Sequence, residues 1–314
     1  MQKEIVRRFM KTQWVQERLK EDWVRETFED WTIESLRLGL KPEGKPRYDD
    51  FIYSVQKGEQ IALSDYGDMF LGFDFKSGIK GLENLILLKD KPILLVANHV
   101  NNGPMKGDWQ HVVISYYVKE TTGEEIRWLH GFDPTTAQDL FRERLHKSIN
   151  SIPIRDNDPS RGGLLLRRAI GIDKASMGLY PEGDGSKNLR RGMPKAGRLI
   201  ATWARNAIDI VSCSVRFQSD TFFLTFDTLD NETIKTIVQK GADRSSSWQD
   251  IADYAMRTIA QHLPENRRGY YEESQKTNGV ELTLTTPSMI LNPHRPAQRI
   301  IDQWTKNKRN KTKL

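Results

Sequence analysis

His99 lies just beyond the end of a predicted strand, which is where α/β proteins form their ligand and active sites. His99 follows the segment 92–97, which is short, apolar and rich in branched side chains, and so predicts a strand covered on both faces. Asp108 comes after a loop containing Asn and Gly, at the N-cap of a helix predicted over 109–118. A carboxylate there can accept the imidazole N–H, and the other ring nitrogen can then take a proton from a hydroxyl. The pair predicts a general base that activates an alcohol. A structural role is the alternative for any histidine near an aspartate.

Two further segments carry groups that suit an anion. Arg155 follows a short predicted strand at 152–154, and its guanidinium matches a phosphate by forked hydrogen bonds, although a surface salt bridge is the alternative. The segment 179–186 combines a strand end, a glycine-rich turn and acidic side chains, among them Glu182 before Gly183. Main-chain N–H groups in such a turn can face an anion or an oxyanion, whereas an ordinary surface turn is the alternative.

Strands and helices alternate around these segments. This alternation predicts an α/β fold in which a layered mixed sheet is flanked by helices. An aromatic run at 70–75 favours an additional strand, and residues 247–250 resemble a capping box that opens a helix. The expected strands lie at 70–75, 92–97, 127–129, 152–154, 178–180, 209–215 and 221–229, and the expected helices at 109–118, 135–148, 160–175, 195–206 and 247–263.

An N-terminal segment precedes this core. Apolar residues recur at helical spacing over residues 1–38, which predicts a helix that either lies in a bilayer surface or packs on the main domain. Residues 41–47 contain two prolines and a glycine, which favours a linker. The expected division is an N-terminal helical segment and linker at 1–60, a main domain at 61–265 and a C-terminal extension at 266–314.

Composition limits the classes of function. The net charge is +6, and much of the excess lies in the tail 306–313, which favours anionic lipid headgroups, acidic carrier proteins, nucleic acid or simple solvation. No apolar run approaches the roughly 18–20 residues of a membrane-spanning helix. The single cysteine, Cys213, excludes an intrachain disulfide and lies in a segment typical of a buried strand. We therefore expect a cytoplasmic protein, at most peripheral on a membrane surface, with no nucleic-acid partner.

Taken in order, five segments resemble the glycerol-phosphate and lysophosphatidate acyltransferase family, over roughly residues 70–265. They are Gly81-Leu82-Glu83-Asn84-Leu85, Ala97-Asn98-His99 with Asp108, Ile152-Pro153-Ile154-Arg155, Tyr180-Pro181-Glu182-Gly183, and Lys195-Ala196-Gly197.

The resemblance implies a glycerolipid acyltransferase fold and the transfer of a fatty acyl group from a thioester to a hydroxyl. His99 would be the general base, Asp108 would orient it, and Arg155 would contact an acceptor phosphate. Glu182 and Gly183 would shape the acceptor site. The donor would be acyl-CoA or an acylated carrier protein, and no cofactor, metal or covalent enzyme intermediate is expected.

Two departures from the family pattern leave alternatives open. The spacing between His99 and Asp108 is longer than in the family. The family's Glu-Gly-Thr-Arg-Ser motif also continues here through Asp184 and Gly185 to Ser186, without its arginine. Lys187, Arg190 or Arg191 in the following loop would compensate in an acceptor site that includes Ser186 and Lys187. The alternatives are an acyltransferase for a lipid acceptor without phosphate and a non-catalytic protein that binds lipid or membrane.

Overall fold

The computed structural model describes residues 33–34, 36–75, 78–100, 109–130, 140–154, 159–183, 185–241 and 244–272. In this part of the chain a mixed sheet of seven strands has the order β1-β7-β6-β2-β5-β3-β4. Neighbouring strands pair in parallel, except that β6 and β7 are antiparallel. The strands are β1 (Ile79–Lys80), β2 (Ile93–Ala97), β3 (Ile126–His130), β4 (Ile152–Pro153), β5 (Ser176–Leu179), β6 (Asp209–Gln218) and β7 (Thr221–Leu229).

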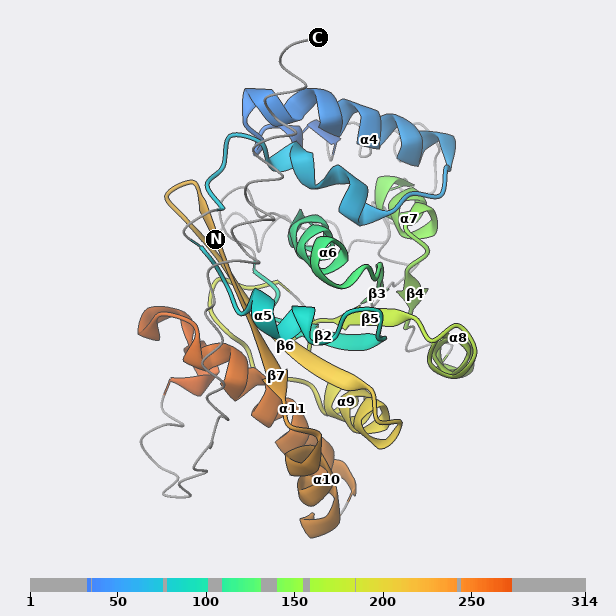
Figure 1. The fold of residues 1–314 in the computed structure, drawn as a ribbon, viewed down its shortest axis with the longest axis vertical. Helices are drawn as coiled ribbons and strands as arrows, with labels where there is room; N and C mark the ends of the chain where they lie inside the picture. Colours follow the sequence, from blue (N-terminus) through green and yellow to red (C-terminus); the bar gives the residue numbers. More distant parts are fainter. Residues whose placement is uncertain are drawn as a thin grey trace, which may run out of the picture.

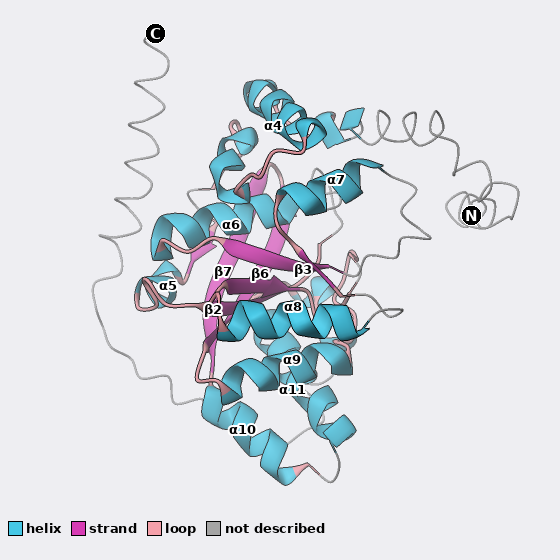
Figure 2. Cartoon of the chain, turned by 90° about the vertical axis from the view of Figure 1, so that its right-hand side faces the viewer, coloured by secondary structure: helices cyan, strands magenta, loops and turns pink. Residues whose placement is uncertain are grey.

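Helices cover both faces of the sheet, which confirms the predicted α/β class. The helices α4 to α7 lie on one face and α8 to α11 on the other (Figure 1, Figure 2). The α-helices are α4 (Lys45–Lys57), α5 (Leu82–Ile86), α6 (Trp109–Thr122), α7 (Leu140–Ser148), α8 (Pro159–Gly171), α9 (Pro194–Arg205), α10 (Asn231–Lys240) and α11 (Arg244–Gln261). Short 3-10 helices are η1 (Pro42–Gly44), η2 (Leu63–Phe70), η3 (Glu265–Arg267) and η4 (Gly269–Tyr271).

Strand β2 is the centre of the molecule. All its residues are buried, and they alternate between the two cores: Leu94 and Val96 face the helices α8 to α11, and Leu95 faces α4 to α7. A parallel strand covered on both faces must be apolar throughout, because neither side reaches water. The predicted buried strand at 92–97 is thus confirmed, and its carboxyl end delivers the chain to His99.

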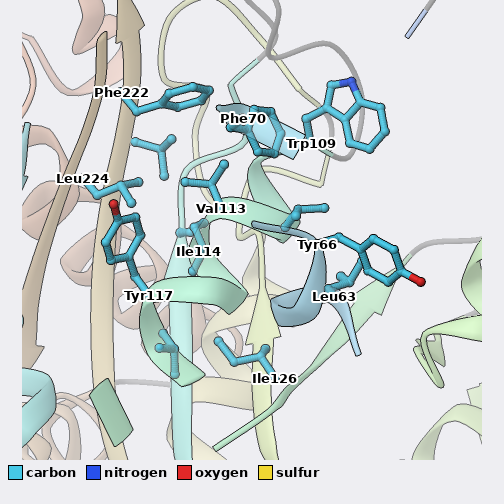
Figure 3. Close-up of a cluster of buried hydrophobic side chains, with 14 of the residues drawn as sticks. Leu63, Tyr66, Phe70, Trp109, Val113, Ile114, Tyr117, Ile126, Phe222 and Leu224 are labelled. Atoms are coloured by element: carbon cyan, nitrogen blue, oxygen red, sulfur yellow. The ribbon is translucent and has the colours of Figure 1, made fainter. Parts of the chain in front are cut away.

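Helix α6 is buried on nearly its whole circumference because it lies between two layers, and its buried residues include the polar Gln110 and Ser115 beside the apolar majority. Figure 3 shows Val113, Ile114 and Tyr117 surrounded by side chains from η2, β3 and β7. A helix buried on most sides lacks the exposed charged face of a surface helix. The predicted helix at 109–118 is confirmed and extends to Thr122.

Three local predictions are wrong. Residues 41–47 are not a linker but form η1 and the start of α4, because a proline fits the first helical turn, whose N–H groups have no partner within the helix. Residues 70–75 form no strand: η2 ends at Phe70, and beyond it only Asp74 makes an isolated bridge. The aromatic run reflects burial in the core rather than extended backbone. The helix α11 begins at Arg244, ahead of the supposed capping box at 247–250.

Other predictions fall largely outside the described residues. Of the segment 1–38, the residues Ile33, Glu34, Leu36 and Arg37 have helical backbone, and the tail 306–313 is not described. Cys213 lies fully buried in β6, where burial raises the pKa of its thiol, as expected of a core residue. Within the described chain, none of the helices combines the length and apolar character needed to cross a bilayer.

Candidate functional site

The carboxyl ends of β2 and β5 bring two of the predicted site residues together. These strands are parallel neighbours, with Val96 opposite Leu179, and His99 and Glu182 each come three residues after this pair. The main-chain N–H of His99 donates to Oε1 of Glu182 over 2.9 Å. Two segments far apart in the sequence therefore meet at one edge of the sheet, where parallel α/β proteins form their ligand sites.

Glu182 is a buried carboxylate, with 6% of its surface exposed. Besides the bond to His99, its Oε2 accepts the main-chain N–H of Arg190 at 2.7 Å and the hydroxyl of Ser186 at 3.4 Å. Burial disfavours the charged form and raises the pKa of Glu182 to about 7, although these donors act in the opposite direction. The carboxylate thus ties the histidine segment to the turn and loop after β5.

The residue before the histidine fixes the neighbouring strand β6. The side-chain amide of Asn98 donates to the carbonyl of Val215 at 2.9 Å, and its Oδ1 accepts the N–H of Val215 at 2.7 Å. Asn98 has 4% of its surface exposed. This two-way bond continues the pairing of β2 and β6 past the end of β2.

The main chain around His99 is held from both sides. The carbonyl of His99 accepts the N–H of Ser186 at 3.0 Å, and the N–H of Val100 donates to Oε1 of Gln110 at 2.9 Å. Gln110 belongs to α6 and is fully buried. Hydrogen bonds to both its N–H and its C=O therefore fix the backbone of His99. The fold thus sets the point from which the imidazole extends.

The imidazole of His99 lies in an aromatic group made by three other elements. It stacks on Tyr180 with ring centroids 4.6 Å apart, and Tyr180 stacks on Trp128 at 5.0 Å. The ring of His111, from α6, meets Tyr180 edge-on at 4.8 Å. Both ring nitrogens of His99 are shielded from solvent, so a hydroxyl reaches one of them only when neighbouring groups move.

A hollow opens beside this arrangement and contains about 320 Å³ of empty space, part of it continuous with solvent. Three cationic side chains line it, and they come from three places in the chain. Lys187 follows the turn after β5, Arg216 lies near the end of β6, and Arg267 ends η3. Its lining also includes Asn98, His99, Glu182, Ser186, Leu189 and Phe217.

The structure brings together four of the site residues predicted from the sequence: His99, Glu182, Ser186 and Lys187 all line the hollow. Gly183 is exposed in the adjoining turn with φ +78° and does not line it.

Asp108 and Arg155 lie outside the described residues, so their predicted roles remain predictions. Sequence reasoning missed Arg216 and Arg267 as site residues. The strand predicted at 209–215 stops just short of Arg216, and only the sheet order shows that this end of β6 lies beside His99.

No group of three or more His, Cys, Asp or Glu side chains among the described residues is arranged to hold a metal ion. In comparisons with known proteins, no family model matches the sequence, and no curated protein matches it at a significant level.

Proposed function

We propose that the chain is an acyltransferase that moves an acyl group from a thioester to a hydroxyl, with His99 as the general base oriented by Asp108. The observation that carries the proposal is the junction of His99 with Glu182 beside a hollow lined by cations. Together with the order of the sequence motifs, it supports the finer assignment to a glycerolipid acyltransferase fold.

The chemistry requires one proton carrier. A ring nitrogen of His99 takes the proton of the acceptor hydroxyl as its oxygen attacks the thioester carbonyl carbon. The tetrahedral intermediate then collapses, the carbon–sulfur bond breaks, and the imidazolium returns the proton to the leaving thiolate. A carboxylate from Asp108 on the other ring nitrogen would hold the tautomer and stabilise the imidazolium. Glu182 acts through the main chain of His99 and is a positioning residue.

Glu182 also fixes the turn after β5 relative to His99. Its two carboxylate oxygens hold the N–H of His99 and the N–H of Arg190, so the wall of the hollow formed after β5 is fixed relative to the imidazole. An acceptor placed against this wall would keep a constant distance to the ring, which is the positioning that accelerates a two-substrate reaction.

The test is thiol release from acyl-CoA and from acylated carrier protein in the presence of a panel of hydroxyl acceptors. A thiol reagent suits this assay because the protein's single cysteine, Cys213, is buried. We expect acceptor-dependent release that falls at least about 100-fold in His99→Ala and in Asp108→Asn. The matched control is His262→Ala, which removes an imidazole paired with Asp227 on β7. Normal turnover by a folded His99→Ala variant excludes the mechanism.

The same assay separates the enzyme from a lipid-binding protein of similar fold. A binding protein would retain lipid or liposomes equally in wild type and His99→Ala and would release no thiol with any acceptor. Phosphorylated and uncharged acceptors in the panel distinguish a glycerol-phosphate type of substrate from a lipid acceptor without phosphate.

A further inference from the structure

The three cations of the hollow have no ion-pair partner in the described chain. Arg216 donates from Nη1 to the neutral side chain of Gln218 at 2.9 Å, and Arg267 donates from Nη1 to the carbonyl of Lys187 at 2.9 Å. No carboxylate among the described residues lies within 4 Å of the charged groups of Lys187, Arg216 or Arg267.

Several arginines elsewhere in the described chain do pair with acids, and none of these lines the hollow. Arg37, Arg47, Arg127 and Arg191, for example, each reach an aspartate at 2.9–3.1 Å. The hollow thus gathers three cationic side chains that no described acid neutralises in an ion pair, and the one acidic side chain in its described lining is the buried Glu182, which hydrogen-bonds to main-chain N–H groups.

Arg216 is held in a geometry that favours an incoming anion. Its guanidinium packs 3.6 Å from the ring centroid of Phe223, and burial lowers the pKa of this arginine. Withdrawal of a cation from water costs free energy, which a bound anion offsets. A planar guanidinium that is already oriented loses less conformational entropy when it forms forked bonds to oxygen atoms.

Arg267 and Lys187 belong to one framework. The N–H of Leu189 donates to the carbonyl of Arg267 at 3.0 Å, so the loop after β5 pairs with η3, in addition to the bond from the Arg267 side chain to Lys187. The loop that carries Lys187 is also the one whose Arg190 N–H is held by Glu182. Lys187 and Arg267 are thus linked to His99 through the loop after β5 and the side-chain carboxyl group of Glu182.

We propose that Arg216, Arg267 and Lys187 form a subsite for the phosphate group of a substrate whose reacting part lies beside His99. Three cations that converge from separate elements match the several oxygen atoms and the double charge of a phosphate ester better than a single carboxylate. The inference rests on the proposed acyl transfer for the identity of the substrate. Two sources share this chemistry: the phosphate of a hydroxyl acceptor and a phosphate of the thioester donor.

The test is calorimetric binding of glycerol 3-phosphate, coenzyme A and inorganic phosphate to the full chain, without turnover. We expect Arg216→Gln and Arg267→Gln each to weaken binding of at least one phosphate ligand about 10-fold or more, since a neutral amide cannot replace the charge-assisted hydrogen bonds of a guanidinium. The matched control is Arg205→Gln. Arg205 is exposed at the end of α9, which precedes the start of β6 and so lies at the opposite edge of the sheet.

The ligands separate the two sources of phosphate. Weaker binding of glycerol 3-phosphate with unchanged binding of coenzyme A assigns the subsite to the acceptor, and the reverse assigns it to the donor. Arg216→Lys keeps the charge but not the fork, so it should recover part of the affinity and guards against a loss caused by misfolding. The proposal is overturned if wild type binds no phosphate ligand. It is also overturned if the double variant, with Arg216→Gln and Arg267→Gln combined, binds every ligand as tightly as Arg205→Gln.

Failure of this subsite is distinguishable from failure of the proposed reaction. Phosphate binding that depends on Arg216 and Arg267, in a protein that releases no thiol with any acceptor, supports the subsite and removes the acyl transfer. Thiol release with an unchanged KM for a phosphorylated acceptor and for the donor in both variants removes the subsite and leaves the acyl transfer standing.

Discussion

The main-chain N–H of His99 donates to the buried carboxylate of Glu182 over 2.9 Å, and the second oxygen of that carboxylate accepts the N–H of Arg190. One side chain therefore joins the end of β2 to the end of β5 and to the loop that follows. Because it is buried, its protonation couples the geometry of the site to pH.

The first prediction concerns the pH dependence of stability through Glu182. Its carboxyl ionises near pH 4.5 in an unfolded chain and near pH 7 in the folded protein. Between these values the folded state binds more protons than the unfolded state, so the free energy of unfolding falls as pH rises. This contribution to the free energy of unfolding is roughly 3 kcal/mol, and it is lost as the pH rises through the folded pKa of about 7. Glu182→Gln cannot titrate and should lack this part of the slope in denaturant unfolding from pH 5 to 8.

The difference between wild type and Glu182→Gln is the informative quantity, because other titrating groups cancel in it. Gln keeps one acceptor oxygen, so one of the two N–H donors loses its partner and the variant is less stable at low pH. Parallel pH profiles for the two proteins would show that Glu182 is not a titrating group in this range.

A second prediction concerns Tyr271, which anchors the other end of the same loop. Its hydroxyl accepts the N–H of Gly192 at 2.9 Å and donates to Oδ1 of Asp253 at 2.8 Å, and 1% of its surface is exposed. Tyr271→Phe leaves a buried N–H without a partner, so the free energy of unfolding should fall by about 2–3 kcal/mol. The neighbouring Tyr270 is 54% exposed, and Tyr270→Phe should change it by less than about 0.5 kcal/mol. Equal urea midpoints for the two variants would contradict this role.

The third prediction tests the bond between Asn98 and β6. Asn98→Ala removes the donor and the acceptor that hold the N–H and carbonyl of Val215. Two buried main-chain groups then lack partners, which should lower the free energy of unfolding by about 2–5 kcal/mol. Asn206→Ala deletes the same amide from an exposed position, where it bonds to the carbonyl of Thr202, and should cost about 1 kcal/mol or less. Chemical denaturation of both variants checks the difference, and a cost for Asn98→Ala no larger than for Asn206→Ala would contradict it.

The sequence predicts the central strand and the place of His99 because both depend on local patterns. A continuous apolar run specifies β2, and a polar residue after it must lie at the sheet edge. The contact between His99 and Glu182 depends on a non-local fact, namely that β5 pairs beside β2 although β3 and β4 come between them in the chain. Neither periodicity nor spacing carries this strand order, so only the resemblance to a family linked the two motifs beforehand.

The cationic side chains that line the hollow were even less predictable from the sequence. Arg216 and Arg267 lie in different elements, and nothing in their local sequence separates them from arginines on the surface. The start of helix α4 was predicted wrongly for a different, local reason. Pro46 taken alone indicates a break, but a proline fits the first turn of a helix. The cations of the hollow, in contrast, are brought together only by contacts between distant segments, which local sequence signals do not indicate.

The last prediction tests the packing of the two helices behind the site. Gly197 in α9 faces the backbone of α11, and a Cβ atom there would lie 1.8 Å from the carbonyl oxygen of Trp248. Because backbone cannot yield as a flexible side chain does, Gly197→Ala must separate the helices and should lower the free energy of unfolding by about 3 kcal/mol or more. Gly171→Ala is the matched control, since a Cβ at the end of α8 meets no atom within 4 Å. This control should be neutral or stabilising by up to about 1 kcal/mol, because alanine has less conformational freedom in the unfolded chain. Thermal unfolding of the pair checks the contrast, and an undiminished midpoint for Gly197→Ala would mean that α9 and α11 do not pack as closely as this contact requires.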